Sequence, residues 1–255
     1  MGLFKNLGDT TLVKGLVYST VGFASYPGIA MVNKLEISGM ENLKDLPKNK
    51  VLFVSNHQTY FADVITFMHI FGAHRFGFTK KLRNPFYLLW PFTRVKFVAA
   101  EETMKSNFLS RLFALAGAIT VKRTWRAEGQ NVHRGRDEND TQKIDDALLK
   151  NWVITFPQGT TKPFAPGRKG TAHIIKNNQP IVIPVVINGF WRAFDKKGLK
   201  FKKKGSTLSV TIKPPLEIDY SNSADTILEQ VMDAIEQSKK FMLKGKHHLM
   251  DMVGK

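Results

Sequence analysis

Short runs of β-branched and aromatic residues alternate along this chain with segments whose apolar residues recur at helical spacing. Strands that alternate with helices build a sheet with helices on its faces. The sequence therefore predicts an α/β fold with a central β-sheet flanked by helices. We expect strands at residues 51–55, 75–80, 95–99, 118–121, 152–156, 181–187 and 208–213, the last as an outer strand. We expect helices at residues 64–71, 86–90, 108–116 and 171–176 and after the N-caps Asp140 and Ser223, with a polar loop at residues 124–138.

The most informative stretch is residues 51–63, in which a predicted strand ends in Asn56-His57 and Asp63 follows near the start of a helix. Imidazole titrates near neutral pH, and a carboxylate can fix its tautomer and stabilise its charged form. His57 and Asp63 are therefore candidates for a general base and the acid that orients it. The same pattern also fits a histidine packed at a strand end, with Asp63 capping the next helix.

A second polar stretch, residues 156–170, follows another predicted strand. It breaks into a turn whose backbone N–H groups could face an anion, and phosphate is the expected ligand. A solvated surface loop is the alternative. Its candidate ligand-binding residues are Gly159, Thr160, Thr161, Lys162, Arg168 and Lys169. The predicted strand at residues 118–121 leads to Arg123, which could hold a phosphate through two hydrogen bonds.

The charge balance points to an anionic partner. Lysine plus arginine number 38 against 21 acidic residues, a net charge of +17. Nucleic acid, an anionic membrane surface, an acidic carrier protein and phosphorylated substrates all remain possible partners on charge alone. No zinc-finger or aromatic RNA-binding signature is visible, so we expect no nucleic acid. The absence of cysteine excludes disulfides and a cysteine nucleophile, and no histidine spacing indicates a metal site.

Two segments suggest contact with a membrane. Residues 15–32 carry no charge over 18 positions, but glycine, proline and hydroxyl residues dilute their hydrophobicity. We interpret residues 1–35 as a helical leader lying on or partly in a bilayer, with a helix packed on a soluble core as the alternative. Residues 196–204 interleave Leu199 and Phe201 with six lysines. This run could settle into lipid head groups or form a solvated basic hairpin.

The order of these stretches resembles the lysophospholipid acyltransferase family, which includes 1-acylglycerol-3-phosphate acyltransferases. The family's first block is Asn-His, four residues and then Asp, whereas five residues separate His57 from Asp63 here. The turn must therefore bulge by one residue if the two side chains are to meet. The second block, a glycine followed six positions later by an arginine, is matched by Gly117 and Arg123.

The third block of the family is Phe-Pro-Glu-Gly-Thr-Arg, and residues 156–161 match it with Gln158 in place of glutamate and Thr161 in place of arginine. The fourth block is an apolar strand with a proline, matched by residues 181–187 around Pro184. The resemblance spans about residues 36–220. It implies an acyltransferase catalytic domain at residues 36–255, behind the leader at residues 1–35.

The resemblance implies that His57 removes the proton from an acceptor hydroxyl as it attacks an acyl thioester, while Asp63 orients His57. The turn at residues 158–162, with Arg123, Arg168 and Lys169, would hold the anionic head group. The expected acceptor is 1-acylglycerol-3-phosphate, giving phosphatidate, with a lyso-aminolipid or another lysolipid as the alternative. Acyl-CoA or an acyl carrier protein would be the donor, with no further cofactor. The expected location is the cytoplasmic face of the inner or plasma membrane.

A hypothesis of another class is a non-catalytic basic module that binds membrane or nucleic acid. It explains the net charge but does not explain why the four sequence blocks of the family occur here in the family's order.

Overall fold

The computed structural model describes residues 11–91, 93–105, 108–122, 126–127, 130–131 and 138–242. Its core is a seven-stranded sheet in the order β1-β9-β8-β2-β7-β3-β4, parallel at every pairing except β8 with β9. The predicted α/β fold is confirmed. The strands are β1 Lys34–Ser38, β2 Val51–Ser55, β3 Val95–Ala100, β4 Ala118–Val121, β7 Trp152–Thr155, β8 Ile181–Asn188 and β9 Thr207–Ile212, and a small separate hairpin pairs β5 Arg126–Ala127 with β6 Gln130–Asn131.

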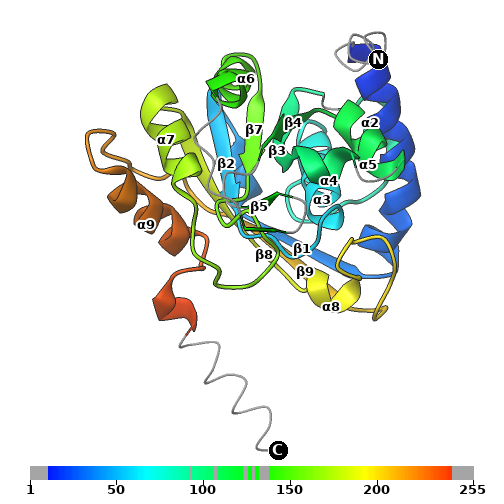
Figure 1. The fold of residues 1–255 in the computed structure, drawn as a ribbon. Helices are drawn as coiled ribbons and strands as arrows, with labels where there is room; N and C mark the ends of the chain where they lie inside the picture. The colour runs from blue at the N-terminus through cyan, green and yellow to red at the C-terminus, as the bar shows by residue number, and fades with distance from the viewer. Residues whose placement is uncertain are drawn as a thin grey trace, which may run out of the picture.

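Helices cover both faces of the sheet (Figure 1). Alternate residues of β2 point to opposite faces of the sheet. Phe53 packs in the hydrophobic cluster on one face, and Leu52 and Val54 pack in the cluster on the other. The first layer contains α2 Thr11–Tyr26, α3 Ala62–His74 and α5 Phe108–Leu115. The second contains α6 Glu138–Leu148, α7 Lys169–Asn178 and α9 Ala224–Ala234. The short helices are α4 Glu101–Lys105, α8 Phe190–Ala193, a π-helical turn Pro27–Met31, and 3₁₀ turns Met40–Leu43 and Phe86–Leu89.

Several details of the sequence-based assignment are wrong. Asp140, predicted as an N-cap, is the third residue of α6, which begins at Glu138, and the helix predicted at residues 86–90 is the 3₁₀ turn Phe86–Leu89. Residues 75–80, predicted as a strand, form the turn that ends α3, because the N–H groups of Phe76 and Gly77 bond to the last carbonyls of that helix. The strand predicted to be outermost, β9, lies inside the sheet between β8 and β1. It is covered because β1, which the sequence does not predict, pairs with it and takes the edge position.

The leader helix α2 packs against the sheet layer through one face and exposes another. Val17 and Tyr18 are buried in the first cluster, and Lys14 Nζ donates to the carbonyls of Thr93 and Val95. The outward stripe holds Leu12, Leu16, Thr20, Phe23, Ala24, Pro27 and Met31, none of them charged. Within the described ranges, no helix is both long and apolar enough to span a bilayer.

The sheet order determines where a site can form. Strands β7 and β8 flank β2 and run parallel to it, so the carboxyl ends of all three lie at one edge. Ligands of open α/β sheets bind outside such carboxyl ends. His57, Phe156 and Asn188 follow or end these three strands and therefore meet at this edge.

Candidate active site

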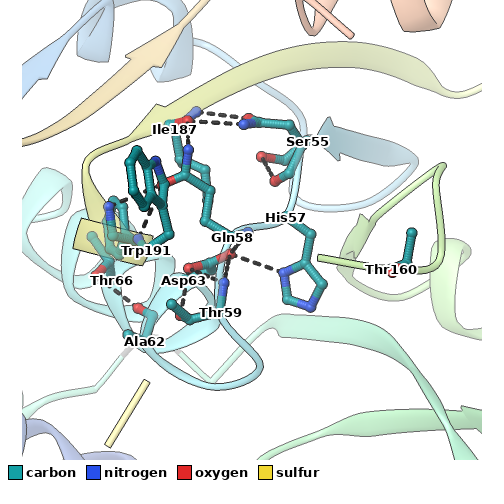
Figure 2. A network of polar contacts seen from close by, with 12 residues as sticks. Ser55, His57, Gln58, Thr59, Ala62, Asp63, Thr66, Thr160, Ile187 and Trp191 are labelled. Carbon is teal, nitrogen blue, oxygen red and sulfur yellow. Dashed lines mark hydrogen bonds and ion pairs between the residues drawn. The ribbon is translucent and has the colours of Figure 1, made fainter. Parts of the chain in front are cut away.

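His57 stands just beyond the carboxyl end of β2, and its side chain is 14% exposed. Its Nδ1 donates a hydrogen bond of 2.9 Å to Oδ2 of Asp63, in the first turn of α3 (Figure 2). With the proton on Nδ1, the Nε2 atom is the nitrogen that can accept one. The five-residue spacing therefore still allows contact between the two side chains.

Asp63 is fully buried, and the turn before it is folded around its carboxylate. Oδ2 accepts hydrogen bonds from the N–H of Gln58 at 2.6 Å and of Thr59 at 3.0 Å. Oδ1 accepts one from the hydroxyl of Thr59 at 2.7 Å. A buried carboxylate with this many donors is held in one orientation, and it holds the imidazole in turn.

Two amide side chains fasten the His57 turn to β8. Asn56 is buried and makes two 2.8 Å bonds to Ile187, its Nδ2 donating to the carbonyl and its Oδ1 accepting from the N–H. This continues the β2–β8 pairing one residue past the strand. Oε1 of Gln58 accepts a 2.9 Å bond from the N–H of Phe190, at the start of α8 (Figure 2).

The third sequence block lies next to His57. The ring of Phe156, directly after β7, stacks on the imidazole with 4.0 Å between centroids and 23° between planes. Gly159 has φ +62°, a conformation that favours glycine, and its N–H bonds to the carbonyl of Phe156 at 2.9 Å. A tight turn therefore follows β7 beside the histidine, and Thr160, drawn in Figure 2, belongs to it.

Gln158 points into the protein, with its side chain bonded inside the loop. It is 2% exposed, and its Nε2 donates to the carbonyl of Ala165 at 3.1 Å and to Oε1 of Gln237 at 3.2 Å. The same Oε1 accepts the N–H of Phe164, whose φ is +55°. In this arrangement Gln158 shapes the loop at residues 158–168 and ties it to the segment after α9.

The cationic candidates occupy different positions. Lys162 is exposed, and its N–H bonds to the hydroxyl of Thr160. Arg168 is exposed just before α7, where its N–H bonds to the carbonyl of Pro157. Lys169 forms a 2.8 Å ion pair with Asp225 of α9. Thr161 is half-buried in the same loop. Arg123 lies outside the described residues, as does most of the predicted loop at residues 124–138.

Two other histidines, His69 and His74, belong to the scaffold. Burial lowers the pKa of His69 to about 3. Its ring is bonded to the hydroxyls of Ser25 and Tyr87 at 2.9 and 2.6 Å, so it joins three segments as a neutral group. Burial also lowers the pKa of His74, at the end of α3, and the hydrogen bond that its ring donates to the backbone of Leu43 opposes this effect. The described residues contain no cluster of three side chains that could hold a metal ion.

Three residues that build this site are missing from the candidates identified in the sequence. Asn56 and Phe156 belong to the matched blocks, and that position was the available signal for both. Nothing in the sequence marks Gln58, because its partners at Ile187 and Phe190 are about 130 positions away. The arrangement as a whole pairs a positioned imidazole with an adjacent loop that carries Lys162 and Arg168 on its exposed side, which suits proton transfer beside an anionic group.

Comparison with known proteins places this geometry in context. Residues 34–188 match the family model described as Acyltransferase. The structure is similar to that of the 1-acyl-sn-glycerophosphate (LPA) acyltransferase PlsC from Thermotoga maritima. The TM-score is 0.52 at 16% sequence identity, over 86% of this chain and 76% of that chain, a likeness that shows the fold alone. No curated protein matches the chain.

Proposed function

This chain belongs to the acyltransferase family, and from that premise we propose that it moves a fatty acyl group from an acyl thioester to the free hydroxyl of a lysophospholipid. The proposed acceptor is 1-acylglycerol-3-phosphate, and the product is then phosphatidate. The observation that carries the proposal is the His57–Asp63 pair, 2.9 Å apart, at the sheet edge beside the Phe156–Thr160 turn. A non-catalytic basic module would explain the net charge of +17 but not membership of an enzyme family.

The reaction follows from the polarity of the pair. Nε2 of His57 takes the hydroxyl proton as the acceptor oxygen bonds to the thioester carbonyl carbon. The tetrahedral intermediate collapses by breaking its carbon–sulfur bond, and the imidazolium returns the proton to the departing thiolate. Asp63 keeps the proton on Nδ1 throughout and offsets the positive charge that develops on the ring. No enzyme nucleophile takes part.

The loop after β7 would bind the head group of the acceptor. Gly159, Thr160 and Thr161 supply the turn, and Lys162 and Arg168 supply cationic donors on its exposed side. Arg123 joins this set in the proposal through its place in the matched sequence block. Lys169 contributes less directly, because Asp225 already pairs with it. Gln158 acts by holding the loop.

The identity of the acceptor is the part most affected by the altered third block. Replacing the family's glutamate by Gln158 and its arginine by Thr161 changes the charge around the head group, and this observation favours a second candidate acceptor. That acceptor is a lyso-aminolipid or another lysolipid, with the chemistry at His57 unchanged. The donor is acyl-CoA or an acyl carrier protein in either case.

The proposed location is the cytoplasmic face of the inner or plasma membrane, and the outward stripe of α2 supports the membrane contact that this requires. An uncharged helix face with Leu12, Leu16 and Phe23 exposed fits the apolar side of an interfacial helix. The lysines elsewhere on the surface would add attraction to anionic lipid, about 1 kcal/mol for each one near the membrane.

An acceptor panel tests the function. Purified protein is given labelled acyl-CoA or acyl carrier protein with 1-acylglycerol-3-phosphate, a lyso-aminolipid or a zwitterionic lysophospholipid. We expect the fastest transfer to 1-acylglycerol-3-phosphate, with labelled phosphatidate as the product. Transfer to another acceptor alone would replace the first candidate by the second. No transfer to any of them would contradict the proposed function.

A further inference from the structure

The segment from Phe190 to Lys204, here called the basic hairpin, is a compact exposed unit. Its two arms meet at the bridge between Phe194 and Phe201, and the N–H of Asp195 bonds to the carbonyl of Lys200 at 2.8 Å. Its exposed side chains are Trp191, Arg192, Lys196, Lys197, Leu199, Lys200, Phe201, Lys202, Lys203 and Lys204. Large apolar and cationic groups therefore alternate over one short surface, which Figure 1 places with α8 at the edge of the molecule.

Asp195 holds the tip of the basic hairpin together. Its Oδ1 accepts the N–H of Leu199 at 2.8 Å and of Lys200 at 3.0 Å. Burial raises the pKa of this carboxyl, but the backbone N–H groups of residues 197–200 outweigh that effect and hold the pKa below its usual value. The carboxylate thus stabilises a turn that crowds several lysines together.

The basic hairpin is bonded directly to the turn between His57 and Asp63. The N–H of Tyr60 donates to the carbonyl of Lys196 at 3.1 Å, and the N–H of Phe61 donates to that of Lys197 at 3.0 Å. The two preceding N–H groups of the turn, at Gln58 and Thr59, donate to Asp63. The catalytic turn is therefore held from inside by Asp63 and from outside by the basic hairpin.

The contact between the two segments is close. Gly198 has φ +78°, and a Cβ on it would lie 2.6 Å from the N of Ala62 and 2.7 Å from Oγ1 of Thr59. Gln58 adds a further link through the N–H of Phe190. The His57 turn is also one residue longer than the spacing in the resembled family, and the basic hairpin binds the two residues that follow Thr59.

We propose that the basic hairpin docks on an anionic lipid surface and that docking fixes the turn from His57 to Asp63, so that the membrane raises the rate of the reaction itself. The inference rests on the proposed function. A segment held on one side by backbone hydrogen bonds to the turn loses its remaining freedom when its other side is bound. The turn and the imidazole that it carries then keep the geometry for proton transfer.

A lipid surface fits this pattern better than an acidic protein does. Trp191 is amphipathic and suits the level of the head groups, while lysines beside Leu199 and Phe201 can reach phosphates as those side chains enter the acyl boundary. Each lysine near an anionic surface strengthens binding by about fivefold. An acidic carrier protein enters the experiment below as a separate arm.

The first test separates binding from rate. A short-chain lysophosphatidate and a short-chain acyl-CoA, both monomeric in solution, are offered with no vesicles, with phosphatidylcholine vesicles, or with vesicles that also contain phosphatidylglycerol. We expect the kcat of the wild type to rise several-fold with the anionic vesicles alone. The triple variant Lys200→Gln, Lys203→Gln, Lys204→Gln should keep the vesicle-free rate, bind anionic vesicles about 100-fold more weakly and lose the stimulation.

The matched control for charge is Lys44→Gln, Lys48→Gln, Lys150→Gln. These lysines are also exposed, but they lie near the amino ends of β2 and β7, at the opposite edge of the sheet from His57. This variant should respond to anionic vesicles as the wild type does. Equal loss of stimulation in both triple variants, or retention in both, would overturn the docking surface. Stimulation by acyl carrier protein in place of vesicles, lost in the hairpin triple variant, would assign the surface to an acidic protein and overturn the lipid assignment.

The second test addresses the coupling. Gly198→Ala should lower the vesicle-free kcat by about tenfold or more, because the added Cβ displaces the turn. Gly205→Ala is the matched control: its φ is +71°, in the same region, but nothing lies within 4 Å of the added Cβ. Equal rates for the two variants would overturn the coupling.

Asp195→Asn provides a variant with a smaller perturbation if Gly198→Ala does not fold. Its weaker acceptor loosens the hairpin tip, so the vesicle-free rate should fall and anionic vesicles should restore it. Failure of restoration would contradict the inference. Wild-type transfer without any vesicle stimulation overturns only this inference, whereas the absence of all transfer removes the proposed function.

Discussion

The carboxylate of Asp63 explains how the longer turn still delivers its histidine. Four donors converge on it: Nδ1 of His57, the N–H groups of Gln58 and Thr59, and the hydroxyl of Thr59. Beyond Thr59, the N–H groups of the next two residues donate to the basic hairpin. At the scale of residues, the distance between His57 and Asp63 is therefore set by the carboxylate and not by the number of residues between them.

Substitutions at the pair test the proposed base. His57→Ala should lower kcat by about 100-fold or more, the usual contribution of a positioned base, and leave vesicle binding intact. Asp63→Asn should be nearly as harmful, because its NH₂ cannot accept the hydrogen bonds that position the imidazole. Steady-state rates with 1-acylglycerol-3-phosphate give the comparison. His74→Ala, at the other end of α3, is the control and should react at the wild-type rate.

A wild-type rate for His57→Ala would remove the proposed mechanism. A wild-type rate for Asp63→Asn alone would mean that another group orients the imidazole.

The residues that form the site can be predicted from the sequence more readily than the directions in which their side chains point. The strand–turn–helix pattern places His57 and Asp63 near one another, and the structure brings them into contact. Gln158 stands at a block position, where it replaces the family's glutamate, and the resemblance predicts it as a ligand-binding residue on that basis. Its side chain is turned toward Gln237, 79 positions away, a contact that no local pattern contains.

At the scale of elements, His69 ties the leader helix to the first layer. One ring nitrogen is hydrogen-bonded to the hydroxyl of Ser25 in α2, and the other to the hydroxyl of Tyr87 in the 3₁₀ turn Phe86–Leu89. Both rings of this buried contact are held in their neutral form, since burial lowers the pKa of His69 and raises that of Tyr87. The joint between α2, α3 and this turn therefore depends on an uncharged imidazole.

This joint predicts how stability changes with pH. The pKa of His69 is about 3 in the folded protein, against an ordinary histidine pKa of 6.5 that describes the unfolded chain. The unfolded state thus binds more protons between these values. The contribution of His69 is complete above about pH 6.5 and is lost as the pH falls, by at most about 1.4 kcal/mol per pH unit.

Denaturant unfolding between about pH 7 and pH 4.5 measures this loss. His69→Gln keeps hydrogen-bonding groups but cannot titrate, so its free energy of unfolding should decline less steeply. A slope equal to that of the wild type would show that His69 is not the group responsible.

Elements with a strong local pattern are predictable, and those that depend on distant pairing are not. The apolar residues of β2 and α3 determine both elements without reference to the rest of the chain. Residues 75–80 alternate as a strand would, but several of their N–H groups are hydrogen-bonded to the carbonyls at the end of α3 and so do not pair with a neighbouring strand. Residues 34–38 alternate between polar and apolar side chains, as a half-buried strand does, but the run is only five residues long. Its partner strand, residues 207–211, lies far along the chain, and no local pattern identifies that pairing.

At the scale of the whole molecule, the surface carries two features suited to a membrane, the outward stripe of α2 and the basic hairpin. They are connected through the π-helical turn after α2, where a Cβ on Gly28 would lie 3.0 Å from the ring of Phe201. The sequence indicates both segments as candidates for membrane contact. That they are neighbours follows from the sheet order, which the sequence does not determine.

The outward stripe can be tested by a matched pair of leucines. Leu16 on α2 is 69% exposed, and Leu149 after α6 is 51% exposed on the other layer. Leu16→Ser should weaken binding to vesicles by roughly tenfold, because up to about 1.5–3 kcal/mol of apolar transfer is lost. Leu149→Ser should leave it unchanged in the same sedimentation assay. Equal binding by both variants would show that α2 does not enter the lipid.

The pairing of β1 with β9 has a consequence for biosynthesis. These strands join residues 34–38 to residues 207–211, so the sheet edge cannot close until the ribosome has added the second partner. At about 5–20 residues per second, the leader helix emerges tens of seconds before the sheet beneath it is complete. During that interval β1 has no strand partner, because β9 is its only neighbour in the sheet that the structure describes, and its unpaired backbone N–H and C=O groups can bind a bilayer surface or a chaperone.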